Sequence, residues 1–158
     1  MSLIIDGSNG LTFPNSTTQA SAGNVIQTVY ATSTTQTSTS STSYVTTGFS
    51  ASITPKFSTS KILVLFAGQV YMDTKGDHCY MAIYRNGSSI YASSALLINS
   101  SASTSGIGGT PTFICQDSPA TTSSTTYTMY FKVGSGGTIY LDGQGSSPYS
   151  LTLMEIAA

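Results

Sequence analysis

Charged side chains are scarce in this sequence. Asp, Glu, Lys and Arg make up 7% of its 158 residues, whereas about 25% is usual for a globular domain. A monomer of 16.4 kDa would expose roughly 7,500 Å², so its five cationic and six anionic side chains would leave about 700 Å² of surface per charge. Charge normally keeps soluble monomers apart, so this composition is typical of a protein that sits in an assembly.

The few cationic side chains are scattered rather than clustered. They are Lys56, Lys61, Lys75, Arg85 and Lys132, and the net charge is −1. Binding to nucleic acid depends on a basic patch that neutralises phosphates. The sequence therefore argues against nucleic acid as a partner.

Long apolar runs and a cationic leader are also missing. No run approaches the roughly 20 residues of a membrane-spanning helix. Leu3-Ile4-Ile5 is too short for the apolar part of a signal peptide, and no Lys or Arg precedes it. These absences indicate a protein that is made in a cytoplasm and is not inserted into a membrane.

Cysteine is rare and tryptophan is absent. Cys79 and Cys115 lie in apolar, strand-like segments, so we expect two buried thiols that behave as small apolar side chains, with a disulfide between them as the alternative. Ten tyrosines are spread over nearly every strand-like segment. A tyrosine buries its ring and keeps a hydrogen bond at the rim, which suits either a subunit interface or an ordinary strand position.

No convincing catalytic or metal-binding pattern is present. His78 is the only histidine, and with Asp73 and Asp77 it lacks the further oxygen donors of a calcium loop, so we expect a solvated hairpin tip there. One histidine among many serines is not a catalytic triad, and the glycine-rich run 134–137 has neither the lysine nor the helix of a phosphate loop. We therefore expect no enzyme activity, no cofactor and no bound metal.

Serine and threonine stand in place of the missing charge. They account for 53 of the 158 residues, and their hydroxyls keep a surface wet without charging it. Such a surface suits a protein in an assembly or in variable ionic conditions. A β-rich domain with a neutral surface is the plainer explanation.

The stretch Lys61–Met72, KILVLFAGQVYM, contains the longest unbroken apolar run, Ile62–Ala67. Its length and its β-branched, aromatic and leucine side chains predict a central strand covered on both faces, rather than a helix. After Ala67 the apolar pattern loosens, as it does in a strand with one face in solvent.

Shorter segments around this stretch alternate apolar and polar residues, as half-buried strands do. Asn86-Gly87 is the strongest hairpin signal. The expected strands are 25–31, 44–48, 49–53, 79–85, 90–92, 112–115, 127–133, 139–141 and 149–156, with a short apolar run at 95–98. The Ser/Thr tract 32–43 forms either a surface loop or an extended edge. Because no segment has a helical pattern, βαβ units are excluded. We predict an all-β fold, an antiparallel β-sandwich of jelly-roll type with an extended N-terminal arm, with a barrel as the other antiparallel solution.

Residues 1–24 differ from the rest of the chain. Small apolar clusters alternate there with turn residues, which predicts a short hairpin or arm with little core of its own. An arm of this kind needs a partner to order it, so we expect its apolar side chains to dock on another molecule. These side chains are Leu3, Ile4, Ile5, Leu11 and Phe13. The predicted division is an attachment arm, 1–24, and a head domain, 25–158.

Three stretches resemble proteins of bacteriophage particles. Residues 5–19, IDGSNGLTFPNSTTQ, are similar to a segment common in phage tail-fibre and other virion appendage proteins, usually just before a C-terminal head domain. Residues 82–87, AIYRNG, together with 61–64, KILV, resemble the hairpin core of those heads, and residues 151–156, LTLMEI, resemble their closing strand. The resemblance implies a trimeric, jelly-roll-like head, loosely similar to those of the C1q and tumour necrosis factor group.

From this resemblance we expect a homotrimeric, non-enzymatic structural protein of the virion, made in the cytoplasm of the host. The first hypothesis is a capsid cement or decoration knob, docked by its arm on the major capsid protein or another virion protein. The alternative is the receptor-binding tip of a phage tail fibre, which would bind a host-surface receptor or glycan through loops 33–43, 100–110 and 118–126. A fibre tip would follow a long rod, whereas this sequence begins at Met1, which favours the knob.

Overall fold

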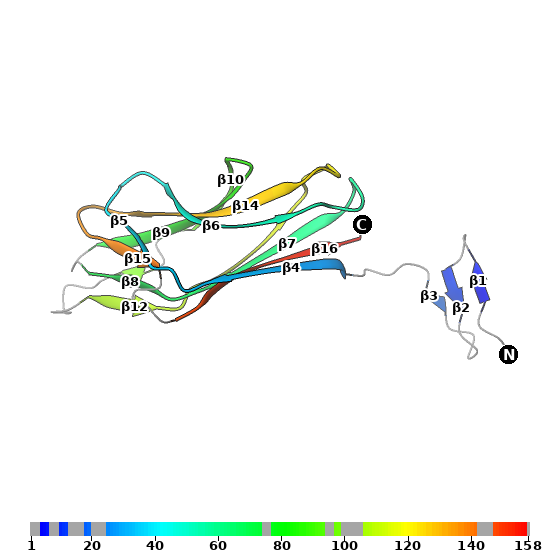
Figure 1. The fold of residues 1–158 in the computed structure, drawn as a ribbon, viewed down its shortest axis with the longest axis horizontal. Helices are drawn as coiled ribbons and strands as arrows, with labels where there is room; N and C mark the ends of the chain where they lie inside the picture. Colours follow the sequence, from blue (N-terminus) through cyan, green and yellow to red (C-terminus); the bar gives the residue numbers. More distant parts are fainter. Residues whose placement is uncertain are drawn as a thin grey trace.

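The computed structural model describes residues 4–6, 10–12, 18–19, 25–73, 77–93, 97–98, 106–141 and 147–157. For 4–6, 10–12, 18–19 and 97–98 it describes the backbone alone. From residue 25 onward the described chain forms two facing layers of antiparallel β-strands, and it contains no helix (Figure 1). None of the described segments could therefore cross a membrane as a long apolar helix.

The first layer, sheet 1, is a four-stranded sheet in which every strand is interrupted once. Its strands are β4 (Val25–Ser33) with β5 (Thr37–Thr39), β7 (Lys61–Ala67) with β8 (Val70–Met72), β12 (Ile107–Gly109) with β13 (Thr112–Asp117), and β15 (Ile139–Leu141) with β16 (Tyr149–Ile156). The two halves have the orders β13-β7-β16-β4 and β12-β8-β15-β5. The order of the strands is thus the same on both sides of the interruption.

Pro111 explains one of these interruptions. Proline has no N–H to donate to a ladder, and it lies between β12 and β13. The ladder resumes in the same register, because Gly109 pairs with Val70 and Thr112 pairs with Ala67. The chain opposite, at Gly68, stays close by donating its N–H to the Pro111 carbonyl over 3.4 Å.

The second layer, sheet 2, has uninterrupted strands. They are β6 (Val45–Ile53), β9 (His78–Arg85), β10 (Ser88–Ala92), β11 (Leu97–Ile98) and β14 (Thr125–Val133). Their order is β10-β9-β14-β6, with β11 also pairing with β9. The predicted hairpin at Asn86-Gly87 joins β9 to β10. Both residues have positive φ, 47° and 86°, as a two-residue type I′ turn requires.

The pairing of these strands confirms the predicted jelly roll. If each interrupted strand of sheet 1 is taken as one, the described head has eight strands in chain order, with β11 as a short addition. The first pairs with the eighth, the second with the seventh, the third with the sixth and the fourth with the fifth. This is one long hairpin rolled up into two sheets, which is the jelly-roll arrangement.

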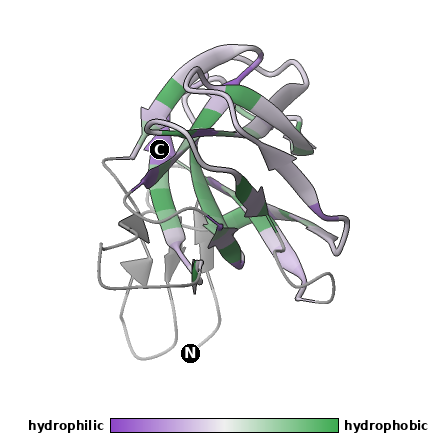
Figure 2. Ribbon diagram, turned by 90° about the vertical axis from the view of Figure 1, so that its left-hand side faces the viewer, coloured by the Kyte–Doolittle hydropathy of each residue, from purple (hydrophilic) through white to green (hydrophobic). Residues whose placement is uncertain are grey.

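The core lies between the two sheets and is built by alternation along each strand. On β7 the side chains of Ile62, Val64 and Phe66 are buried, and on β14 those of Met129 and Phe131. Figure 2 shows the resulting bands of hydrophobic residues along the strands. The remaining large members of the core are Phe49, Ile53, Val70, Met72, Met81, Ile83, Phe113, Tyr127, Val133, Ile139, Leu141, Tyr149, Leu151 and Leu153.

The prediction that β7 is covered on both faces is wrong for the isolated chain. Only alternate residues of the strand are buried, and Leu63 and Leu65 on its other face are only half-buried. A jelly roll has two layers, so each sheet has one inner and one outer face. The outer face of sheet 1 thus carries apolar side chains that the chain itself does not cover.

Other segments differ from the predictions in smaller ways. The tract 32–43 is in part an extended edge, since β4 runs to Ser33 and β5 follows. The two strands predicted in 44–53 are one strand, β6, with a bulge opposite the stretch between Thr128 and Tyr130. Part of the loop predicted at 100–109 is a strand, β12, and 100–105 lie outside the described residues.

The predicted arm has a backbone sheet of its own. β1 (Ile4–Asp6), β2 (Gly10–Thr12) and β3 (Thr18–Gln19) form a three-stranded antiparallel sheet in that order. Ile5 pairs with Leu11 across the first two strands. Isolated sheets this small are marginal in water. Only the backbone of the arm is described, so its small core and the division at residue 24 stay predictions.

Candidate interaction surfaces

The outer face of sheet 1 is the largest candidate surface. The side chains that point away from the core on its strands are apolar or carry only a hydroxyl, with a few amide and glycine positions. Its large apolar members are Tyr30, Leu63, Leu65, Tyr71, Ile114, Tyr140 and Met154. Tyr30 and Ile114 are 65% and 59% exposed, which is unusual for large apolar side chains on the surface of a monomeric protein. Large apolar surface that is left open on a sheet typically marks a place where another molecule packs.

The strand register places these side chains in rows. Leu65 lies between Ile114 and Thr152, and Thr152 is paired in turn with Tyr30. In the next row Leu63 lies beside Met154. Cross-strand neighbours of this kind lie about 5 Å apart, so Ile114, Leu65, Leu63 and Met154 form an apolar band across three strands. Thr152 separates this band from Tyr30 on the fourth strand.

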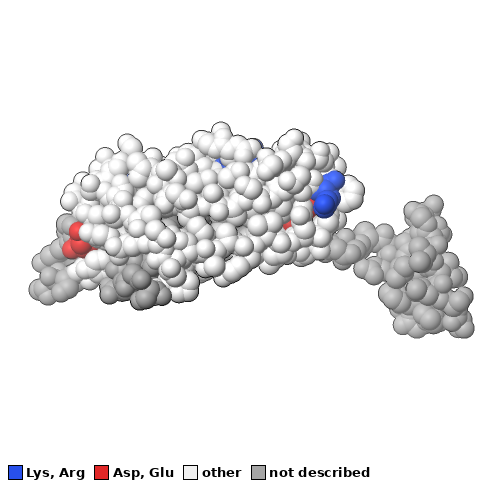
Figure 3. Space-filling view, viewed as in Figure 1, with Lys and Arg blue, Asp and Glu red and all other residues white. Residues whose placement is uncertain are grey.

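Charge is nearly absent from this face. Lys61, at the start of β7, is the one charged side chain that the described strands of sheet 1 point outward. The two carboxylates of these strands, Asp117 and Glu155, lie on the inner side, opposite the buried Ile62. Figure 3 shows the same scarcity on one side of the molecule, where only small groups of charged atoms interrupt the described surface. Covering such a face costs little desolvation of charge.

The outer face of sheet 2 carries a second candidate, a tyrosine cluster formed by Tyr44, Tyr80, Tyr84 and Tyr130 around Lys132. The rings of Tyr84 and Tyr130 stack with their centroids 3.8 Å apart, and Tyr44 lies 6.4 Å from Tyr84. The Lys132 ammonium lies 5.1 Å from the Tyr44 ring and 4.8 Å from the Tyr80 ring. Burial, then the neighbouring tyrosines, raises the pKa of Tyr44, so its hydroxyl stays protonated at neutral pH.

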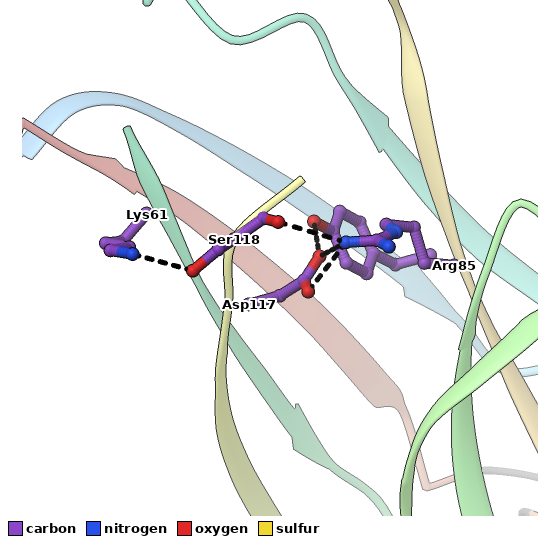
Figure 4. Close-up of polar contacts among 5 residues, drawn as sticks. Lys61, Arg85, Asp117 and Ser118 are labelled. Carbon is purple, nitrogen blue, oxygen red and sulfur yellow. Dashed lines mark hydrogen bonds and ion pairs between the residues drawn. The ribbon is translucent and has the colours of Figure 1, made fainter. Parts of the chain in front are cut away.

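One ion pair joins the two sheets at the end of the sandwich. Arg85 on β9 donates from Nη1 to both carboxylate oxygens of Asp117 on β13, at 2.8 and 2.9 Å. Arg85 also donates to the Ser118 carbonyl, and Lys61 donates to the Ser118 hydroxyl over 2.7 Å (Figure 4). The Tyr127 hydroxyl completes the set by donating to Asp117 over 2.7 Å. Both carboxylate oxygens of Asp117 are thus occupied by Arg85 and Tyr127 of the facing sheet, which indicates a structural clamp.

Glu155 is buried, and its carboxylate accepts hydrogen bonds from the backbone. Its carboxylate accepts hydrogen bonds from Gln27 Nε2 at 2.6 Å and from the N–H groups of Lys56 and Phe57 at 2.7 and 3.3 Å. Burial alone would raise the pKa of Glu155, but the hydrogen bonds outweigh it and hold that pKa below its ordinary value. The group therefore stays ionised and fixes the turn that precedes β7.

The burial of Asp77 contradicts the prediction that this segment is a solvated hairpin tip. The residue is 1% exposed, and its carboxylate accepts the N–H groups of His78, Ser135, Gly136 and Gly137 at 2.7 to 3.1 Å. Burial acts to raise the pKa of Asp77, yet these bonds hold it below its ordinary value. The glycine-rich run 134–137 thus forms a nest of N–H groups that binds a carboxylate of the same chain.

The remaining candidates for chemistry do not come together. Among the described residues no cluster of His, Cys, Asp and Glu could hold a metal ion. No disulfide joins Cys79 and Cys115; the first is buried as expected, whereas the second is only half-buried. Burial, then the charge of Asp117, raises the pKa of the Cys115 thiol to about 11, so a nucleophilic thiolate is scarce at neutral pH.

The structure leaves the docking residues of the arm largely untested. Ile4 and Ile5 lie on β1 and Leu11 on β2, with only their backbone described. Leu3 and Phe13 lie outside the described residues. Their docking role therefore remains a prediction.

The proposed binding loops are described in part. The first, 33–43, runs along β5 at the edge of sheet 1, and the third, 118–126, joins β13 to β14. Most of the second, 100–110, lies outside the described residues. Sequence reasoning missed both outer faces, although the unbroken run Ile62–Ala67 was a signal that β7 has apolar side chains on each side.

Comparison with known proteins adds little. No model of a protein family matches this chain, and no curated protein matches its sequence. In structure it is similar to the infectious bursal disease virus VP2 subviral particle, with 17% identity over 85% of this chain and 38% of that one, at a TM-score of 0.44. It is also similar to T=1 particles derived from the same virus, with 15% identity over 99% of this chain and 45% of that one, at a TM-score of 0.41.

The chain spans less than half the length of these viral chains. At these identities and TM-scores the likeness carries no inference about function. The jelly-roll assignment rests on the strand pairing itself.

Proposed function

We propose that this chain is a non-enzymatic structural protein of a bacteriophage particle, a homotrimeric capsid cement or decoration knob that attaches through residues 1–24. Its function would be mechanical: the head associates with copies of itself, and the arms hold the trimer on a virion protein. The observation that carries the proposal is the outer face of sheet 1.

The apolar side chains of that face support self-association. Leu63 and Leu65 belong to the apolar run from which we predicted a strand covered on both faces. In the folded chain only the other face of this strand is fully buried. Full burial of such a side chain contributes roughly 1.5–3 kcal/mol, so finishing the burial of half-covered ones would contribute on the order of 1 kcal/mol each. Several of them in one band, with Ile114 and Met154 beside them, supply the apolar centre that a subunit interface needs.

Three features support the rest of the proposal. The jelly-roll topology agrees with the resemblance to trimeric phage heads. Among the described strands, the three short strands of the arm pair only with one another. The scarcity of charge, 7% of the residues, suits a protein that is surrounded by other subunits.

The mass of the particle in solution tests the trimer. Analytical ultracentrifugation should give three times 16.4 kDa. Leu65→Lys places a charge in the centre of the apolar band and should convert the trimer to a folded monomer, because Leu65 contributes to no part of the chain's own core. Ser50→Lys, on the exposed outer face of sheet 2, is the matched control and should remain trimeric.

Two results would contradict this assignment. A monomeric wild-type protein at micromolar concentration would exclude strong self-association. A Leu65→Lys variant that stays trimeric would move the interface away from the outer face of sheet 1.

The tyrosine cluster on sheet 2 favours a second candidate function, the receptor-binding tip of a phage tail fibre. Tyrosines are enriched in binding surfaces. The four in this cluster are half-buried, and their face would remain open in a trimer assembled through sheet 1. Copy number separates the two functions: purified virions should contain hundreds of copies of a cement protein but only a few dozen of a fibre tip. A quantitative gel of virions decides between them.

A further inference from the structure

The end of the sandwich at which β4 begins carries exposed apolar side chains. In the last row of sheet 1, Lys61 of β7 pairs with Ile156 of β16, and Ile156 pairs with Val25 of β4. The turn 54–60 joins β6 to β7 at the same end. Val25 is 53% exposed, and Phe57 in the turn is 58% exposed. We call the surface formed by these four residues and Lys56 the arm end, because residue 25 directly follows the arm in the sequence.

The turn that carries Phe57 is fixed by hydrogen bonds to its backbone. Gln27 Nε2 donates to the Thr54 carbonyl over 2.7 Å. The Glu155 carboxylate accepts the N–H groups of Lys56 and Phe57. The backbone that presents the Phe57 ring is therefore fixed before a partner arrives, which lowers the entropy cost of binding.

The chain itself gives no reason for the exposure of Phe57. The ring contributes nothing to the core between the sheets. It lies on a turn between the two sheets and not on the outer face of sheet 1, so the proposed trimer interface does not account for it either. Large aromatic side chains are enriched at protein interfaces, where they act as anchors that fill a pocket of the partner. Phe57 thus has the position and the chemistry of such an anchor.

The charge that the arm end shows to solvent is positive. Lys56 is exposed and Lys61 is half-buried, and within the described part of the chain neither ammonium forms an ion pair. The carboxylates of this end are already occupied, since Asp117 pairs with Arg85 and Glu155 is fully buried. Figure 3 shows a group of cationic atoms at this end of the head. A partner surface that carries Asp or Glu side chains would complement it.

We propose that the arm end is a second docking surface, which seats the head on an acidic protein surface with an apolar pocket for the Phe57 ring. The proposal rests on the proposed attachment of residues 1–24 to a virion protein, and its partner is that same protein. Phe57 supplies most of the binding free energy, while Lys56 and Lys61 speed association and fix the orientation. Because the arm is covalently continuous with Val25, a bound arm holds this surface at a high effective concentration beside the particle.

Binding of the full chain to particles tests the apolar part of this surface. The particles are virions of the encoding phage assembled without this chain, immobilised for surface plasmon resonance. Phe57→Ser should weaken binding at least about tenfold, as loss of an interface anchor does, mainly through faster dissociation. Phe57→Leu keeps a large apolar side chain and should retain most of the affinity. Equal binding of Phe57→Ser and the wild type would overturn the proposal.

Charge reversal tests the ionic part. Lys56→Glu should slow association about tenfold at about 50 mM salt, and the difference from the wild type should shrink at about 500 mM salt because of screening. Lys56→Arg keeps the charge and should bind like the wild type. Lys132→Glu makes the same reversal near the opposite end of the head, beside Tyr80, and is the matched control. Equal effects of the two reversals would indicate attraction by net charge alone and would overturn the assignment of this surface.

Two measurements on the free protein separate this surface from the fold and from the trimer. Because Phe57 and Lys56 are exposed, the Tm of their variants should lie within about 3 °C of the wild type. A larger loss would show that the side chain packs on its own chain and would overturn its docking role. Sedimentation should give the mass of the wild type, and a monomeric Phe57→Ser variant would place Phe57 in the subunit interface instead.

The wild-type protein distinguishes failure of this surface from failure of the proposed function. If the wild type does not bind the particles, the attachment itself is refuted, and the arm end falls with it. If the wild type binds and the Phe57 and Lys56 variants bind equally well, only the arm end is refuted, and the arm alone accounts for attachment.

Discussion

The hydroxyl of Tyr127 on sheet 2 donates a 2.7 Å hydrogen bond to Oδ2 of Asp117 on sheet 1. Asp117 also accepts both bonds from Arg85, so one carboxylate ties two strands of one sheet to a strand of the other. Burial, then the hydrogen bond to Asp117, raises the pKa of Tyr127. The phenol therefore remains a donor throughout the ordinary pH range, and the clamp does not depend on its titration.

Tyr127→Phe should destabilise the head by about 1.5–3 kcal/mol, the range for a hydrogen bond to a charged group. The ring would still fill the core, so the loss reports the hydroxyl alone. Urea unfolding at neutral pH measures it. Tyr80→Phe, on the outer face of sheet 2, is the control and should change the free energy of unfolding by less than about 0.5 kcal/mol. Equal effects of the two substitutions would show that the clamp contributes nothing.

Acid should unfold this protein through Glu155 and Asp77. The pKa values of both carboxyls are lower in the folded state than their ordinary values, near 4.5 and 3.8. The unfolded chain therefore binds protons more readily. The stability that these groups contribute is fully present above their ordinary pKa values, and it is lost as the pH falls from those values through the lower pKa values of the folded state. Urea unfolding at pH 7, 5, 4 and 3 should show a plateau followed by a decline that begins near pH 4.5.

Glu155→Gln tests this assignment. The variant should be less stable than the wild type at pH 7. With its amide oxygen in the place of Oε1, the side chain can still accept the N–H groups of Lys56 and Phe57, but without the charge that strengthens these bonds. The amide NH₂ in the place of Oε2 cannot accept the bond from Gln27 Nε2. Its stability should then fall less between pH 5 and pH 3. An unchanged slope would show that other groups cause the acid transition.

Gly68→Ala should be strongly unfavourable because the backbone of β16 passes very close. A Cβ at Gly68 would lie 2.5 Å from Cβ of Tyr149 and 2.9 Å from the Phe66 ring. Overpacking of a core typically costs about 1–3 kcal/mol, and thermal unfolding would show it as a lower Tm. Gly136→Ala is the matched control, since nothing lies within 4 Å of its added methyl group. A tolerated Gly68→Ala would mean that the two sheet halves can separate at the interruption.

Deletion of residues 1–23 should leave the head folded with a nearly unchanged thermal transition, while abolishing incorporation into particles. The expectation follows from strand pairing, because β1, β2 and β3 pair only with one another among the described strands. Differential scanning calorimetry and a virion-binding assay measure the two effects. Failure of the truncated chain to fold would place the arm in the core, and normal binding would move the docking role to the head.

Much of the fold could be predicted from local pattern. The strands at 139–141 and 149–156 have the predicted bounds. A half-buried strand points every second side chain into the core, so its apolar and polar residues alternate along the sequence. The Asn86-Gly87 turn was predictable because few residue pairs adopt positive φ at two successive positions. The short alternating segments and the absence of helical periodicity were sufficient for the all-β class.

The candidate sites were much less predictable, because each depends on residues far apart in the chain. Asp77 could not be recognised as buried, since its partners at 134–137 lie nearly sixty residues away. The pairing of Asp117 with Arg85, and the arm end, exist only because the rolled hairpin brings distant strands to one end. A run such as Ile62–Ala67 shows that both faces of a strand are apolar. Only the packing of two sheets decides which face the chain covers itself and which it leaves partly open.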